Sequence, residues 1–329
     1  MMRSLARKFG IGNLVRLYYH RPIGLMRLSM AEGGPLQQRK TNQGHEDMKV
    51  AARNLPAMAE PSNPYPVGVT YLSGEKYWHQ TLFCFMSLQI HTDRKIDFQI
   101  FDDGSFTDQT MDLVRSMVPW VKFVTNDDIT TRLNAKLPVE SYPSLRARRL
   151  EYPHLRKLTD IHCQSDGWTL VLDSDMLFFK RPDELLDWMA EPDHPIFMQD
   201  VQTYYGYPKE YLDRQVGIDV PERINVGLYA LFGPDIDWQK VELWCHDQIR
   251  ELGTSYLQEQ GLTAQVLALH GPRALPDSEY VVKPDLAEGF APTGALHHYV
   301  AEAKRAYFQF GWQEIQKRLF VTTGKSEAA

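Results

Sequence analysis

Two carboxylates one residue apart follow a hydrophobic segment near the middle of the chain. Residues 168–172 (WTLVL) predict a strand that runs directly into Asp173-Ser174-Asp175. A strand ending this way leaves both carboxylates at the carboxyl edge of a sheet, where open α/β sheets bind their ligands. Carboxylates there can hold a hard divalent cation, and the cation can hold a diphosphate. Apolar residues flank the pair on both sides, which favours a metal site over a solvated turn or a helix cap.

Two other acidic motifs compete with this one. Asp235-Ile236-Asp237 follows Gly233-Pro234 and precedes an amphipathic segment, so Asp237 is expected to cap a helix. Asp102-Asp103-Gly104-Ser105 follows a second predicted strand and favours a tight turn with Gly104 at positive φ, with Ser105 or Asp108 capping the next helix. Asp102 and Asp103 also lie at a strand end, where they could accept hydrogen bonds from a nucleobase or ribose.

A pair of histidines late in the chain offers a further ligand. His297-His298-Tyr299 follows an apolar residue, and Lys304 lies six residues beyond His298. Next to a carboxylate site, one of these imidazoles is the natural third protein ligand, although the spacing leaves open which one. Imidazole and carboxylate together suit Mn²⁺ better than Ca²⁺. Lys304 could reach the same diphosphate.

The elements that must position these residues alternate along the chain. Strands are expected over residues 67–72, 96–101, 120–124, 168–172, 196–198 and 224–232. Helices are expected over residues 75–90, 108–117, 146–162 with a break at Pro153, 182–190, 237–252 and 259–269. This alternation predicts an α/β fold with a mostly parallel sheet, flanked by helices on both faces.

The order of these motifs resembles that of glycosyltransferases with the GT-A fold, and is most similar to glycosyltransferase family 8. Besides the Asp173 pair, Asn225-Val226-Gly227 resembles the family's N-x-G strand, and Glu259-Gln260-Gly261-Leu262 its acid-Gln segment. The stretch from His298 to Lys304 resembles its late His-to-Lys pattern. The resemblance implies a single nucleotide-sugar-binding domain with Rossmann-like architecture, over roughly residues 66–310.

The resemblance also implies roles for individual residues. Asp173, Asp175 and His298 would hold the metal, Lys304 the diphosphate, and Asn225 and Gln260 would face the donor sugar. The family's lysine upstream of the metal strand falls at Lys157 or at Arg156. The full set of expected site residues is Gln260, Glu259 and Asp200 for the reaction, and Tyr71, Asp102, Asp103, Lys157, Ser174, Asn225, Gly227 and Lys304 for the donor.

The chain departs from the family pattern at three places: two bear on how the diphosphate is enclosed, and the third bears on the stereochemistry. Ala301 stands where the family has glycine, and Arg305-Ala306 replaces Pro-Trp. The Asp-Asp-Gly-Ser turn is similar to family 2 instead, whose members invert the anomeric configuration. The expected reaction is metal-dependent transfer of a sugar from a nucleoside diphosphate, with a UDP-sugar and Mn²⁺ or Mg²⁺ favoured, and retention favoured over inversion.

Other readings of the same residues remain. Phosphatases of the haloacid-dehalogenase type also use a D-x-D, but they prefer Thr or Val where this chain has Leu177. Nucleotidyltransferases usually carry a longer glycine-rich loop after their first strand than the residues Ser73-Gly74-Glu75-Lys76. A binding module on the same fold could hold a nucleotide-sugar or a glycan without transferring it.

Charge is unevenly distributed along the 329 residues, whose formal net charge is −6. Residues 1–54 carry ten Lys/Arg and three acids, so they contribute +7 and the remainder −13. We expect a basic arm and linker over residues 1–62, the catalytic domain over 63–310 and a tail over 311–329. The arm could touch an anionic membrane or simply be a solvated extension.

Partners and location follow from composition only in outline. Three scattered cysteines and the lack of a long apolar stretch favour a cytoplasmic protein, peripheral to a membrane at most. A glycan, lipid or protein could be the acceptor, and no nucleic-acid partner is expected. Residues 201–223 contain Tyr204, Tyr205, Tyr207 and Tyr211, and this long segment is expected to be an acceptor-side loop, a lid or a covering loop, with Asp200 at its mouth.

Overall fold

The computed structural model describes residues 33–163 and 165–324. Its centre is a seven-stranded sheet of order β3-β2-β1-β4-β7-β6-β8. Only the pairings of β7 with β4 and with β6 are antiparallel within this sheet, so the expected mostly parallel sheet is confirmed. The strands span Val69–Ser73 (β1), Phe98–Asp102 (β2), Lys122–Val124 (β3), Trp168–Leu172 (β4), Ile196–Gln199 (β6), Ile224–Phe232 (β7) and Arg273–Ala274 (β8).

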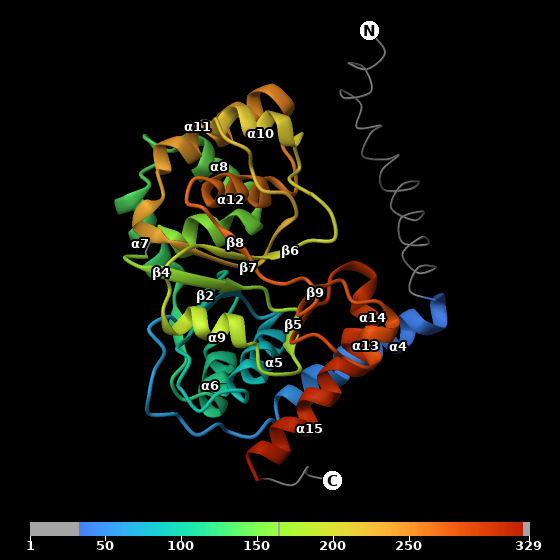
Figure 1. Ribbon diagram of the computed structural model, residues 1–329. Coiled ribbons are helices and arrows are strands. Elements are labelled where there is room, and N and C mark those ends of the chain that lie inside the picture. Colours follow the sequence, from blue (N-terminus) through green and yellow to red (C-terminus); the bar gives the residue numbers. More distant parts are fainter. Residues whose placement is uncertain (1–32, 164, 325–329) are drawn as a thin grey trace, which may run out of the picture.

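Helices cover both faces of this sheet (Figure 1). On one face lie α5 (Trp78–Gln89), α6 (Asp108–Met117) and α9 (Asp183–Ala190), and on the other α7 (Asn126–Lys136), α8 (Pro143–Glu151), α10 (Lys209–Val216), α11 (Trp238–Leu252) and α12 (Gln258–Ala268). Strand β4 shows how the sheet serves both layers. Leu170 and Leu172 join the core that includes α5, whereas Val171 between them joins the core that includes α12. Burial on both faces explains why this strand is continuously apolar.

A second, three-stranded sheet brings the late histidines to the carboxylates. Its order is β5-β10-β9, with β5 at Met176–Phe178, β10 at Leu296–His298 and β9 at Tyr280–Val282. β5 begins directly after Asp175, and β10 pairs antiparallel with it so that His298 lies opposite Met176. Three-residue strands are too short to show a periodic pattern, and the sequence did not predict this sheet.

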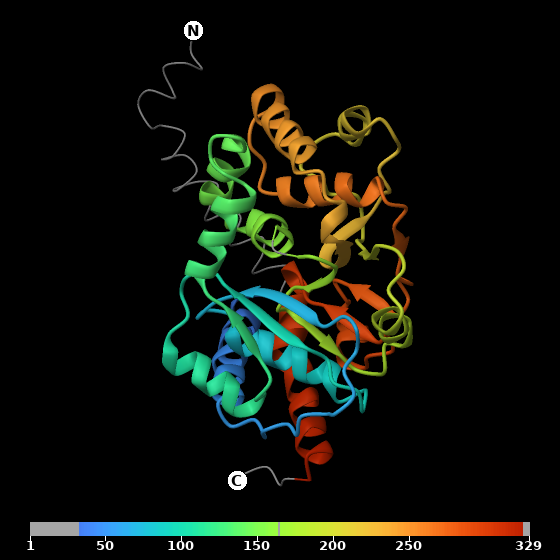
Figure 2. The ribbon, with the colours of Figure 1, turned by 90° about the vertical axis from the view of Figure 1, so that its left-hand side faces the viewer.

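Helices at both ends of the described chain pack on the main core. In the arm, α4 (Pro35–Ala52) buries Met48 and Ala52, and in the segment expected as a tail, α15 (Trp312–Thr322) buries Leu319. All three residues belong to the core that includes α5. Both views show α15 running away from α10 and α11, toward the opposite end of the molecule (Figure 1, Figure 2). Residues 1–32 of the expected arm lie outside the described residues.

The turns and helix caps agree with the sequence-based expectations at some positions and differ at others. Gly104 has a φ of 94°, and Asp237 caps α11 by accepting from two backbone amides, both as expected. Thr107 caps α6, so the expectation of Ser105 or Asp108 was wrong; the helix begins where the Thr107 hydroxyl can reach the amide of Thr110. The segment 201–223 is not a simple loop, because it contains α10.

Two further observations concern the cysteines and the membrane. Cys84, Cys163 and Cys245 are all buried and free, as expected of small apolar residues. Within residues 33–163 and 165–324, no helix is long and apolar enough to cross a membrane.

Candidate active site

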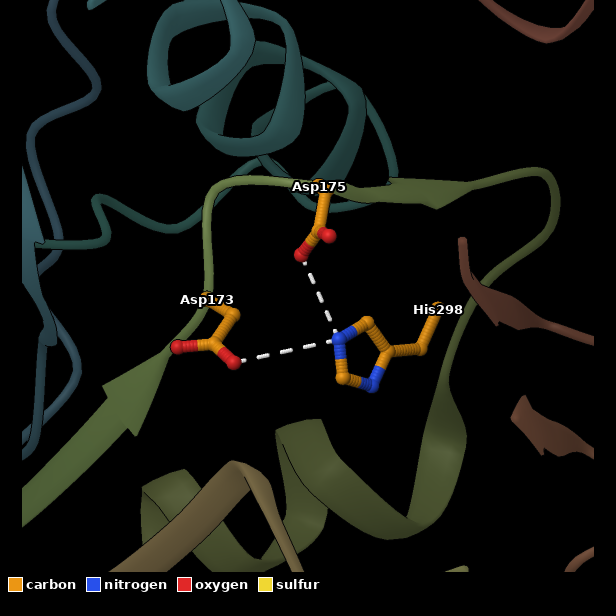
Figure 3. A group of neighbouring side chains, drawn as sticks. All are labelled: Asp173, Asp175 and His298. Atoms are coloured by element: carbon orange, nitrogen blue, oxygen red, sulfur yellow. Dashed lines mark ion pairs between the residues drawn. The ribbon is translucent and has the colours of Figure 1, made fainter. Parts of the chain in front are cut away.

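Asp173, Asp175 and His298 converge at the carboxyl edge of the central sheet (Figure 3). Asp173 follows β4, Asp175 precedes β5, and His298 ends β10. The Nε2 atom of His298 lies 3.2 Å from Oδ1 of Asp175 and 3.8 Å from Oδ2 of Asp173. One potential ligand atom from each residue lies within 4.8 Å of the others, which is compatible with one shared cation. The residues that the sequence proposed as ligands are therefore brought together.

The structure distinguishes the two histidines. His297 is fully buried with both ring nitrogens engaged, Nε2 with Glu288 at 2.7 Å and Nδ1 with the hydroxyl of Tyr299 at 3.1 Å. Neighbouring residues of a strand point to opposite sides, so His298 faces the carboxylates. Nε2 of the buried His298 is directed at both carboxylates, and among the described residues its Nδ1 atom has no hydrogen-bond partner. The nitrogen that meets the carboxylates is therefore placed to share a ligand with them.

Gly227 provides the space that this imidazole occupies. A Cβ atom at Gly227 would lie 2.3 Å from Cε1 and 2.7 Å from Nδ1 of His298. The Gly227 carbonyl also accepts the backbone amide of Asp173 at 2.7 Å, so the same residue aligns the metal strand. The N-x-G pattern thus has a steric basis on β7.

Two lysines pair with the two carboxylates. Lys157 Nζ lies 2.9 Å from Oδ1 of Asp173, and Lys304 Nζ lies 2.5 Å from Oδ2 of Asp175. Burial raises the pKa of Asp175, but Lys304 and His298 lower it more, so it lies well below its usual value. Burial lowers the pKa of Lys157, but the charges of Asp173 and Glu259 raise it by more. Its pKa therefore lies above the usual value, and the ammonium stays charged. The site is thus a balanced set of two anions and two cations.

Of the two candidates for the basic residue upstream of β4, Lys157 and Arg156, the contacts favour Lys157. Lys157 contacts Asp173 and the carbonyl of Val226, whereas Arg156 donates to the carbonyl of Asp103 at 2.7 Å. Lys157 opens a π-helical turn, Lys157–Ile161, and a second one, Tyr307–Gly311, begins three residues after Lys304. Such turns are rare and occur often at functional sites.

The acid-Gln segment begins the buried helix α12. Glu259 is 3 % exposed, and its Oε1 lies 3.9 Å from Lys157 Nζ without a hydrogen-bond partner among the described residues. Burial raises the pKa of Glu259 to about 7, although Lys157 lowers it. Gln260 donates to the carbonyl of Ile224 at 2.8 Å, which joins α12 to the start of β7. A carboxyl with an unsatisfied oxygen is available to a substrate hydroxyl.

Asn225 and Asp200 form a pair beside this helix. Asn225 Nδ2 donates to Oδ2 of Asp200 at 2.8 Å, while its own Oδ1 accepts the amide of Gly227 at 2.8 Å. The other carboxylate oxygen of Asp200 accepts the amide of Val201 at 2.7 Å. Both residues are therefore held by the β6–β7 edge of the sheet.

Of the remaining candidates for the donor site, Asp102 and Ser174 lie at strand ends on the carboxyl edge of the sheet, whereas Tyr71 lies in the core. Asp102 Oδ1 accepts the amides of Gly104, Ser105 and Phe106, so it shapes the turn after β2 next to the end of β1. Ser174 shares a hydrogen bond of 2.8 Å with Thr81 of α5. Tyr71 is different, because it is fully buried, packs edge-on to Phe98 and donates to Sγ of Cys84. These contacts make Tyr71 a core residue, and we leave it out of the site.

Comparison with known proteins bears on the fold. No protein-family model matches the chain, and no curated protein matches it significantly. The galactosyltransferase LgtC, solved with donor and acceptor sugar analogues, superposes with a TM-score of 0.51 at 14 % identity, over 80 % of this chain and 98 % of LgtC. Mouse xyloside xylosyltransferase 1 superposes with a TM-score of 0.50 at 10 % identity, over 72 % and 98 % of the two chains.

The chain has the GT-A fold. The expected fold class is thereby confirmed, and the edge of the sheet that carries the carboxylates is the ligand-binding edge of an open α/β fold.

A divalent cation fits the donor set of this GT-A site. Two carboxylates and one imidazole are ligands of divalent cations, and the ion would meet the Nε2 atom that His298 directs at both carboxylates. The residues that would hold the ion are Asp173, Asp175 and His298.

The structure also adds residues that the sequence did not indicate. Tyr152 and His154 lie in adjacent positions around Pro153, just before Lys157, and their rings are 5.2 Å apart. Thr81 of α5 bonds both Ser174 and Ser73. No periodicity or motif marks these residues, because their role depends on elements distant in the chain.

Proposed function

We propose that this protein transfers a sugar from a nucleoside diphosphate donor, favoured as a UDP-sugar, with Mn²⁺ or Mg²⁺ as cofactor. The observation that carries the proposal is the meeting of Asp173, Asp175 and His298, with Nε2 of the buried imidazole directed at both carboxylates. Similarity to glycosyltransferase folds supports the same reaction class.

Positively charged side chains of the protein lie where the leaving diphosphate would carry its negative charge. Cleavage of a sugar–diphosphate bond develops negative charge on the diphosphate, and a bound cation supplies Lewis-acid stabilisation of that charge. Lys304 lies in contact with Asp175 and would add a mobile positive charge at the same place. Lys157 is buried and engaged with Asp173, so its part is to hold that carboxylate in position.

Donor recognition is assigned to residues around the metal group. Asp102 and Asp103 at the end of β2 are proposed to accept hydrogen bonds from the base or ribose, and Asn225, Gln260 and Glu259 to meet the sugar. The carboxyl of Glu259 supports this role because Oε1 is buried and lacks a partner among the described residues.

We infer retention of the anomeric configuration. An inverting transfer needs a free carboxylate to activate the acceptor hydroxyl, and Asp200 accepts a hydrogen bond on each of its oxygens. The carboxyl of Glu259 is buried beside Lys157 and is assigned above to the donor sugar, so it does not serve as this base. The anomeric proton coupling of the product, measured by NMR, distinguishes the two outcomes.

A cytoplasmic location, with the basic arm against an anionic membrane, stays a prediction.

The first test of the proposal is donor binding. Thermal shifts should be recorded with UDP- and GDP-sugars, with and without Mn²⁺, on the wild-type protein and on Asp175→Asn. We expect one donor class to stabilise the wild type only with Mn²⁺, and the variant to lose this shift. If no donor stabilises the wild type, or the variant keeps the full shift, the proposal is overturned. Asp183→Asn, an exposed position at the start of α9, serves as the matched control.

A further inference from the structure

Three aromatic residues beside the candidate active site are linked by one ring contact and one hydrogen bond to the backbone. Tyr152 and His154 flank Pro153 with ring centroids 5.2 Å apart, and the Tyr152 hydroxyl donates to the backbone carbonyl of Tyr256. The guanidinium of Arg148 lies 4.8 Å from the centroid of the Tyr152 ring. We call Tyr152, His154 and Tyr256 the aromatic platform.

Both ends of the platform connect to site residues. His154 precedes Lys157 by three residues, and Tyr256 precedes Glu259 by three residues. Helix α12, which carries Glu259, also packs against the turn Pro153–Leu155 that contains His154. The platform therefore leads outward from the site itself.

The segment that carries Tyr256 is firmly anchored although the side chain is exposed. Arg148 donates to the carbonyl of Ser255 at 2.7 Å, and the Tyr207 hydroxyl donates to the carbonyl of Gly253 at 2.9 Å. A Cβ at Gly206 would lie 2.4 Å from Oγ of Ser255, so residues near 206 pack directly against this segment. Tyr256 is nevertheless 74 % exposed. An immobilised backbone that presents a large aromatic ring to solvent is suited to stacking with a ligand.

The chemistry of the surrounding segments selects the ligand. Residues 201–207 (VQTYYGY) and 253–258 (GTSYLQ) contain tyrosine, serine, threonine and glutamine and no charged side chain. Residues 148–157, which carry Tyr152 and His154, contain four cations, and each is engaged within the fold. Arg148 contacts Gln258 and Ser255, Arg149 pairs with Asp160, Arg156 donates to the carbonyl of Asp103, and Lys157 pairs with Asp173. A phosphate headgroup or an acidic peptide would require free cations here. A sugar needs an aromatic face and neutral hydrogen-bonding groups, and both are present.

We propose that the aromatic platform binds a neutral carbohydrate acceptor, with Tyr256 stacking on a sugar ring. This inference rests on the proposed transferase function and specifies its acceptor as a glycan. Tyr256 is then a binding residue for the acceptor and has no part in holding the donor.

The experiment measures glycan binding independently of transfer. Saturation-transfer NMR should be recorded on the full chain with neutral gluco-, galacto-, manno- and xylo-oligosaccharides, in the presence of UDP and Mn²⁺. We expect at least one oligosaccharide to bind the wild type, Tyr256→Ala to weaken its apparent affinity about tenfold, and Tyr256→Phe to stay within about twofold. Val321→Ala, which truncates an 81 % exposed residue of α15, is the control and should bind like the wild type.

The outcomes separate this inference from the proposed function. Equal binding by Tyr256→Ala, or binding of anionic phospholipid vesicles and of no oligosaccharide, would overturn the platform as a glycan site. Donor binding and nucleoside diphosphate release by hydrolysis, measured on the wild type without acceptor, test the transferase function separately. If the wild type releases none and binds no donor, the transferase function fails, whatever the glycan result.

Discussion

Gly227 and His298 are in such close contact that no side chain larger than hydrogen fits between them: a Cβ at position 227 would lie 2.3 Å from Cε1 of the imidazole. Two residues far apart in the chain are thereby matched in shape, and the position of the proposed third metal ligand depends on a residue that has no side chain to bind metal.

Replacing Gly227 with alanine should therefore weaken metal binding. The added methyl displaces the His298 ring, which is the movable partner, and we expect Mn²⁺ affinity to fall about 10- to 100-fold, as when an outer-shell partner is lost. Manganese titration followed by electron paramagnetic resonance measures this. Gly167→Ala is the control, because no atom of the described residues lies within 4 Å of its added Cβ, and it should leave affinity unchanged. Unaltered affinity in Gly227→Ala would contradict the steric argument.

Replacing Ala301 with glycine should stabilise the protein. Ala301 has a φ of 49°, a left-handed conformation that favours glycine, and it stands where the family has glycine. The free energy gained by relieving this backbone strain exceeds the free energy lost because glycine makes the unfolded chain more flexible. We therefore expect the free energy of unfolding to rise by about 0.5–1 kcal/mol. Ala303→Gly, at a φ of −64°, is the matched control and should lose a similar amount in chemical denaturation. Destabilisation by Ala301→Gly would contradict this.

Replacing Lys304 with alanine should separate catalysis from metal binding. Loss of a positive charge at the leaving diphosphate should lower kcat about 100-fold. The ammonium also pairs with Asp175, so its removal frees that carboxylate and should tighten Mn²⁺ binding a few-fold. Steady-state kinetics and manganese titration test the two effects, with the exposed Lys317→Ala on α15 as control. A variant that keeps its kcat would exclude Lys304 from the reaction.

The buried carboxyl of Glu259 should make stability depend on pH. Its pKa is raised to about 7 in the folded protein, so the folded state holds this proton more tightly than the unfolded state. The resulting stability is complete below pH 4.5 and is lost as the pH rises through about 7. Glu259→Gln should reduce the difference in unfolding free energy between pH 5 and pH 8 by about 1–3 kcal/mol, measured by urea denaturation. An unchanged difference would show that the carboxyl is not desolvated.

Glu288 should show the opposite dependence. Burial raises its pKa, but donors from Gly294 and Thr293 lower it more, and it falls to about 2. This carboxylate stabilises the fold above pH 4.5, and the contribution is lost as the pH falls through about 2. Glu288→Gln should therefore destabilise the protein at pH 7 and have little effect near pH 2. An equal loss at both pH values would point to packing rather than charge.

Most strands and helices of the central sheet were predictable because they are long enough to show a period or a buried run, whereas β8 and α7 were not predicted. Residues 168–172, 224–232 and 108–117 were predicted with the bounds that the structure gives. β5, β9 and β10 were not, since three residues carry no period, and α10 was missed inside a segment whose tyrosines suggested a loop.

Site residues were predictable where a local sequence motif marks them, and not where their role depends on tertiary contacts. Asp173 and Asp175 are marked by their strand, but the choice of His298 over His297 required the register of β10 against β5. Tyr71 looked suitable for the donor because it lies on β1, yet its side chain points into the core. Tyr152 and His154 reach the site through the fold of the chain around Pro153, which no sequence pattern reveals.

The small sheet β5-β10-β9 has a consequence for biosynthesis. Asp173 and Asp175 are synthesised more than one hundred residues before His298 and Lys304, so a nascent chain cannot assemble the full candidate metal site until residues 298–304 have emerged. During that interval Asp173 has Lys157 as a partner, whereas both partners of Asp175 are still missing. Late truncation by a premature stop codon would therefore leave most of the central sheet encoded and the active centre incomplete.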